Sequence, residues 1–149
     1  MGLTCSCGFI IPGLQPIGPI IVVYFDNQEQ RLGSITYLVN VCAEQMEQSF
    51  VNFSFDDNSG LSSDRSFSFE SSQIREVICN IQEGNCVIDV LGDGLITGET
   101  EPRPFRVTLT LDPDLETLVV DFAVSEYAFS GFAQYLQEDV TTFGCDEVI

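Results

Sequence analysis

The chain has 149 residues, a length typical of one domain that can bury an adequate core without metal ions. It carries 23 acidic residues against five arginines, with no lysine or histidine, and its net charge is −18. This charge excludes nucleic acid as a partner, because phosphate binding needs basic side chains, and it attracts cations instead. No apolar run approaches the ~20 residues that span a bilayer, so no membrane span is expected.

The first 19 residues are predicted to form a flexible arm ahead of one domain that covers residues 20–149. Prolines alternate with glycines in this arm, which disfavours its inclusion in a central strand. Cys5 and Cys7 lie near its tip. We therefore expect an extended spacer that presents two thiols at a distance from the domain.

Alternation of apolar and polar residues predicts strands along the rest of the chain. In chain order, the expected strands are 20–25, 34–41, 50–55, 66–70, 76–81, 85–90, 104–111, 117–124 and, less regular, 132–137. Residues 43–48 fit either one helical turn or a strand-to-strand connection, and an acidic tail ends the chain. About eight or nine short strands predict an all-β fold, an antiparallel β-sandwich with jelly-roll topology favoured.

Two of the six cysteines fall on the expected hairpin of 76–81 and 85–90. If the loop places Cys79 opposite Cys86, their Cβ atoms lie about 4.5 to 5.5 Å apart, close to the separation of a disulfide. An intrachain Cys79–Cys86 bridge is therefore predicted. The alternative is a pair of reduced core cysteines.

The other four cysteines have no obvious partner within the chain. Cys5 and Cys7 are the candidate donors of intermolecular disulfides, and Cys42 and Cys145 are the candidate acceptors. A homopolymer stitched by these bonds would withstand the repulsion between copies that each carry −18. Because such disulfides need an oxidising setting, an extracellular or spore-surface location is expected.

The cysteine-bearing arm with its motif "TCSCG", the spacer and the single β-rich body resemble the endospore appendage fibre subunits of spore-forming bacteria. The resemblance implies a self-assembling extracellular fibre, whose subunits are joined through arm cysteines and by strand addition between neighbours. That family typically has adjacent arm cysteines, whereas Ser6 separates them here.

Two other classes of function remain open. A monomeric Ca²⁺-binding or adhesion module would use acidic loops, and the candidate ligands are Asp56, Asp57 and Asn58, or Asp89, Asp93 and Glu99. Neither set has the spacing of an EF-hand loop. A lipid-anchored domain is the third class, because "MGLTCS" fits N-myristoylation at Gly2 with palmitoylation at Cys5.

Catalysis and cofactor binding are not expected. Without histidine or lysine, a nucleophile lacks its usual base, and a thiol lacks the cationic neighbour that lowers its pKa. The Cys-x-Cys pair of the arm supplies too few ligands for a structural metal site, so no metal or cofactor is predicted.

Overall fold

The computed structural model describes residues 7–10, 15–25, 30–60, 65–112, 117–124, 127–134 and 141–143. These residues form ten strands and one short 3₁₀ helix, η1 (Ala43–Gln48). The strands are β1 (Gly8–Ile10), β2 (Gln15–Tyr24), β3 (Gln30–Cys42), β4 (Phe50–Asp57), β5 (Phe67–Gln82), β6 (Asn85–Ile96), β7 (Arg103–Asp112), β8 (Thr117–Val124), β9 (Tyr127–Gln134) and β10 (Thr141–Phe143). Every pairing between them is antiparallel. The predicted all-β antiparallel class is confirmed, and 43–48 is a helical turn. In this part of the chain no helix has the length and hydropathy needed to cross a membrane.

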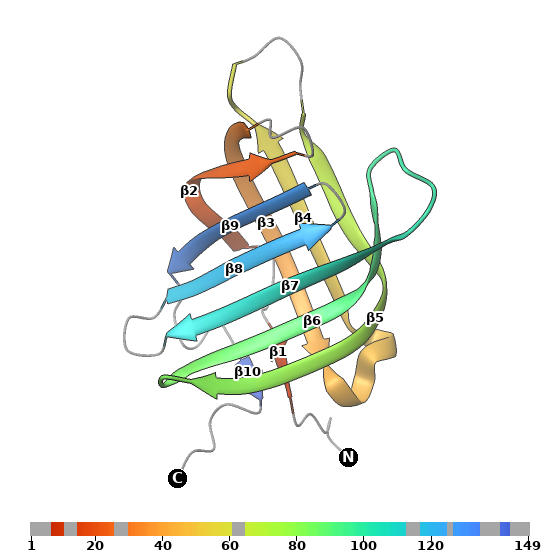
Figure 1. Ribbon diagram of the computed structural model, residues 1–149, viewed down its shortest axis with the longest axis vertical. Coiled ribbons are helices and arrows are strands. Elements are labelled where there is room, and N and C mark those ends of the chain that lie inside the picture. The colour runs from red at the N-terminus through yellow and green to blue at the C-terminus, as the bar shows by residue number, and fades with distance from the viewer. Residues whose placement is uncertain are drawn as a thin grey trace.

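The strands from β2 to β9 pair in chain order, and β2 also pairs with β9, so the sheet closes on itself. Figure 1 shows this sheet flattened into two layers, with β6, β7, β8 and β9 across the front and β3 and β4 behind them. The fold is therefore sandwich-like. Its strand order is not that of a jelly roll, because a jelly roll needs Greek-key crossovers, whereas from β2 to β9 each connection leads to the adjacent strand.

β5 is the corner between the two layers, and it curves from the back layer to the front one in Figure 1. Its ladder with β6 shifts register between Ser71 and Gln73 and again between Ile74 and Glu76, and such bulges bend a strand. Opposite the corner, a Cβ added at Gly94 would lie 2.3 Å from the ring of Phe69. Glycine at this position therefore lets an aromatic ring lie directly against the backbone where the sheet turns.

Aromatic side chains fill the space between the layers. Burial alternates along β6 from Cys86 to Ile96, as expected for a strand with one face toward the core. The rings of Phe53 and Phe122 approach to 4.6 Å between centroids, and Phe122 also contacts Phe129 at 5.3 Å. The interior is therefore a packed core built mainly from phenylalanine, valine, leucine and isoleucine.

The prediction of a flexible arm over residues 1–19 is wrong for the described part of that segment. β1 pairs with both β3 and β10, and Phe9 is completely buried in the core. β2 begins at Gln15 and accommodates its prolines in two ways. A register shift between Ile17 and Ile21 removes Pro19 from the ladder with β3. Pro16 pairs with β3 on one side, and among the described residues no strand pairs with it on the other side. The first structured residue is therefore well ahead of residue 20, while residues 1–6 lie outside the described part.

Several strands are longer than their sequence patterns indicated. The separate strands expected at 66–70 and 76–81 are one continuous strand, β5, because the intervening polar residues form its bulges rather than a turn. Residues 132–134 of the irregular segment at 132–137 are the end of β9, which begins at Tyr127, and residues 135–137 lie outside the described part. β1 and β10 were not predicted, since three residues carry too little alternation to be recognised.

Candidate functional site

One end of the closed sheet is fastened by a disulfide between Cys7 and Cys79, whose Cα atoms are 5.7 Å apart. Cys7 directly precedes β1, and its carbonyl accepts a hydrogen bond from the N–H of Ala43 at 2.9 Å. The bond ties β1 to β5 across 72 positions of sequence and holds Phe9 in the core. Cys7 is therefore not a donor of intermolecular disulfides, as the sequence had suggested, but is bonded within its own chain.

The predicted bridge between Cys79 and Cys86 is also wrong, because the hairpin is tighter than expected. Its turn consists of Glu83 and Gly84, which have φ of 54° and 84°, the left-handed values of a two-residue hairpin turn. Cys79 consequently lies opposite Ile88, while Cys86 lies opposite Ile81. The two cysteines lie on the same face of the hairpin but are offset by two residues along the strands, which is too far for a direct disulfide.

Cys42 and Cys86 each take part in a disulfide as well, so none of the four cysteines in the described segments is a thiol. Cys42 is the last residue of β3, where it pairs with Gly8, and Cys86 is the second residue of β6, with its side chain in the core. Cys5 and Cys145 lie outside the described residues. The reduced-cysteine alternative for Cys79 and Cys86 is therefore wrong.

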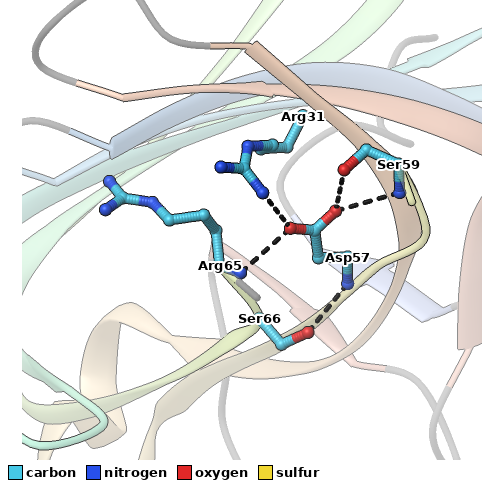
Figure 2. Close-up of polar contacts among 5 residues, drawn as sticks. All are labelled: Arg31, Asp57, Ser59, Arg65 and Ser66. Atoms are coloured by element: carbon cyan, nitrogen blue, oxygen red, sulfur yellow. Dashed lines mark hydrogen bonds and ion pairs between the residues drawn. The ribbon is translucent and has the colours of Figure 1, made fainter. Parts of the chain in front are cut away.

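At the opposite end of the closed sheet, a buried ion pair joins Arg31 of β3 to Asp57 of β4. The distance from Nη1 to Oδ2 is 2.8 Å, and both side chains are nearly inaccessible, with 5% and 3% of their surface exposed. Figure 2 shows the Asp57 carboxylate at the centre of a network drawn from both sides of the β4–β5 connection. Oδ2 also accepts the backbone N–H of Arg65, and Oδ1 accepts the backbone N–H and the hydroxyl of Ser59.

This network fixes the charge of Asp57. Burial by itself raises the pKa of the carboxyl, but the hydrogen bonds from Ser59, Arg65 and Arg31 outweigh that effect and hold the pKa well below its ordinary range. Asp57 is therefore ionised at neutral pH and is a poor proton donor. The side chain of Arg65 points away from the carboxylate in Figure 2, and its guanidinium lies 4.3 Å from the ring centroid of Phe25, in a cation–π contact.

Four of the five acidic residues proposed as calcium ligands, all except Asp56, have partners within the protein. The lone pairs of Asp57 accept four hydrogen bonds. In the second set, each acid is paired with a different arginine: Asp89 with Arg106, Asp93 with Arg75 and Glu99 with Arg103. No cluster of three or more metal-ligating side chains forms within the described segments. The acids of the second set therefore serve as partners for three separate arginines, and Asp57 of the first set is occupied by its own hydrogen bonds.

Sequence reasoning missed the Arg31–Asp57 pair, although a signal for it existed. Arg31, Gly33, Ile35 and Tyr37 share one side of β3, so extending the apolar alternation toward the N-terminus places an arginine on the buried face. A buried guanidinium requires a carboxylate partner. The partner could not be identified from sequence, because it depends on the register of β3 with β4, in which Gly33 lies opposite Asp57.

The side of the molecule where β2 meets β9 has a different chemistry from the rest. β1, β2, β9 and β10 contain no aspartate, glutamate, lysine or arginine, whereas each strand from β3 to β8 contains at least one. Within the described residues, β9 pairs with β2 only at Ala128 and Phe129, so that residues 130–134 pair with β8 alone. β10 likewise pairs only with β1. On this side, which we call the uncharged edge (β1, β2, β9 and β10), part of the strand backbone has no strand partner among the described residues.

The fold and these features define a disulfide-tied, closed antiparallel domain with an acidic surface and one uncharged edge. In comparisons with protein-family models, curated proteins and solved structures, no family, relative or structural neighbour matches the chain. Its function is therefore argued below from its own residues.

Proposed function

We propose that the protein is a structural subunit that self-assembles into a fibre outside the cell or on a spore surface, by addition of strands between neighbouring copies. The observation that carries this proposal is the uncharged edge of a chain whose net charge is −18. Proteins usually protect an unpaired strand edge with charges or proline. β2 has prolines and a bulge, but β9, "YAFSGFAQ", has neither proline nor charge.

Electrostatics favours association through this edge over any other side. Two copies that approach through β3 to β8 bring their acidic residues together, whereas approach through the uncharged edge keeps those charges farther apart. An outer groove of about 420 Å³ adjoins the edge. Tyr24 and Ala128 line it on the side of the edge, and Arg106 and Asp121 are among the residues that line it on β7 and β8. Tyr24 is 47% exposed, which leaves aromatic surface for a second copy to cover.

The disulfides support the location in this proposal. Bonds such as Cys7–Cys79 form and persist in oxidising environments and are rare in the cytosol. Because the described cysteines are bonded, the subunit we propose uses them to stiffen itself, and main-chain hydrogen bonds join its copies. This arrangement keeps the strand addition implied by the resemblance to endospore appendage subunits and does not assign Cys7 to the links between copies.

The experiment compares wild type with Ser130→Lys and Gln73→Lys by sedimentation velocity and electron microscopy at low and physiological salt. Ser130 follows the buried Phe129 on β9, while Gln73 is an exposed residue of β5, so both variants change the net charge equally but at different places. We expect wild type and Gln73→Lys to form fibres, more readily as salt screens the repulsion, and Ser130→Lys to stay monomeric. A wild-type protein that is monomeric under every condition would refute the proposal, as would equal assembly of both variants.

A further inference from the structure

A second surface feature lies on the outer face of β3, β4 and β5, away from the uncharged edge. It is a groove of about 400 Å³, within the size range of small-molecule sites. Thr36, Ser54 and Ser68 are opposite one another on the three strands. Thr97 continues this row after β6, because its hydroxyl accepts the Ser68 N–H at 2.9 Å and donates to the Ser68 carbonyl. Four hydroxyl side chains therefore line the groove in a single row.

The neighbouring row adds an amide and a carboxylate. Asn52 of β4 lies opposite Glu70 of β5, and both residues line the groove. Oδ1 of Asn52 is buried and has no hydrogen-bond partner, which is unfavourable for an amide oxygen. Rotation about χ2 exchanges the positions of the oxygen and the nitrogen of an amide. The oxygen of Asn52 can therefore turn toward the groove and accept a hydrogen bond from a donor placed there.

The charges of the groove restrict what it can bind. Glu70 is exposed, and none of the ion pairs found among the described residues involves it. Glu99, at the loop side, has Oε1 2.9 Å from Nε of Arg103, an ion pair without the alignment of a hydrogen bond. An anionic ligand would be repelled by Glu70 and by the net charge of the chain, and an apolar one would leave Asn52 without a partner and cover the polar hydroxyl row.

We propose that this groove binds a neutral saccharide. A sugar carries hydroxyl groups that both donate and accept, which matches the row of Thr36, Ser54, Ser68 and Thr97 and supplies the donor that Asn52 lacks. Glu70 is a further acceptor for sugar hydroxyls. This activity belongs to each subunit and does not depend on assembly through the uncharged edge.

The test is an NMR titration of the full chain, as the monomeric Ser130→Lys variant if wild type assembles, with cellobiose, maltose and N,N′-diacetylchitobiose. Glucose 1-phosphate and spermidine are the anionic and cationic comparisons. We expect at least one neutral sugar to shift the amide signals of Ser54, Ser68, Glu70 and Thr97. Absence of these shifts with all three sugars would overturn the proposal, as would stronger shifts of the same signals by glucose 1-phosphate or spermidine.

Two variants locate the site, and a third serves as the matched control. Asn52→Leu removes the amide, and Ser54→Ala removes a hydroxyl that contacts the side chain of Ser68 on the outer face, so the second variant retains the fold if the first does not. Each is expected to weaken sugar binding by about tenfold or more, while Gln73→Ala, on β5 but outside the groove lining, leaves it unchanged. Binding that is equal in all three variants would overturn the assignment to this groove.

Discussion

Arg31 and Asp57 lie on adjacent strands with Nη1 and Oδ2 2.8 Å apart, and this contact is sealed from water at one end of the closed sheet. Such a pair contributes little as a whole relative to apolar residues of the same size, but loss of one partner leaves the other charge buried and unmatched. The consequences for stability therefore differ between single and double substitutions.

Asp57→Asn should lower the free energy of unfolding by about 3 to 5 kcal/mol, because it leaves the Arg31 guanidinium buried without a counter-charge. Arg31→Met combined with Asp57→Asn should recover a large part of that loss. Urea unfolding of the two single variants and the double variant measures the coupling. Strictly additive losses would show that the two side chains do not depend on each other.

The same carboxylate makes stability depend on pH in the acid range. The pKa of Asp57 is held below its ordinary value of 3.8, so its contribution is present above that value and is lost as the pH falls further. We expect the melting temperature of wild type to fall more steeply below pH 4 than that of Asp57→Asn. Parallel melting curves for the two proteins through this range, followed by circular dichroism, would contradict the assignment.

The Cys7–Cys79 bond closes a long loop, and its removal should be costly. The double variant Cys7→Ser, Cys79→Ser should lose about 2 to 4 kcal/mol of unfolding free energy under non-reducing conditions. It should also lose protection against amide exchange in β1, since three ladder positions alone hold that strand to β3. Hydrogen exchange measured by mass spectrometry checks both effects, and unchanged protection of residues 8–10 would show that the disulfide does not hold β1.

Gly94→Val should be destabilising by about 1 to 3 kcal/mol, because its side chain would overlap the ring of Phe69 at the corner of the sheet. Gly98→Ala is the control, since a Cβ there meets nothing within 4 Å and its cost comes from the φ of 90° alone. Thermal unfolding of both variants distinguishes crowding from backbone strain. An equal or larger loss in Gly98→Ala would refute the packing explanation.

Tyr37 should ionise late in an alkaline titration, because burial raises its pKa to about 12. An unfolded tyrosine ionises near 10, so the folded state loses stability as the pH rises above that value. The ultraviolet absorbance of phenolate, followed through alkaline titration, should show a late component that coincides with unfolding and is absent in Tyr37→Phe. A late component that persists in Tyr37→Phe would assign it to another residue.

The sequence was sufficient to predict the fold class and most strands, because period-two alternation along segments such as 104–111 and 117–124 depends on local burial alone. It was not sufficient for features that depend on contacts between distant segments. The turn at Glu83 and Gly84 shifts the hairpin register, and this shift removes the expected Cys79–Cys86 bridge. β1 is recognisable only through its contacts with β3, β5 and β10, so the true partner of Cys7 could not be inferred from cysteine spacing.

The closed sheet also separates two kinds of sequence position. Along β6, β7 and β8, inward residues pack against the aromatic core, while their immediate neighbours, such as Leu91, Arg106 and Ala123, form a continuous outward row across the strands. Substitutions in that row change what the surface can recognise and leave the interior intact. The domain is consequently a natural scaffold, on which new binding specificities can arise, or be engineered, without redesign of its core.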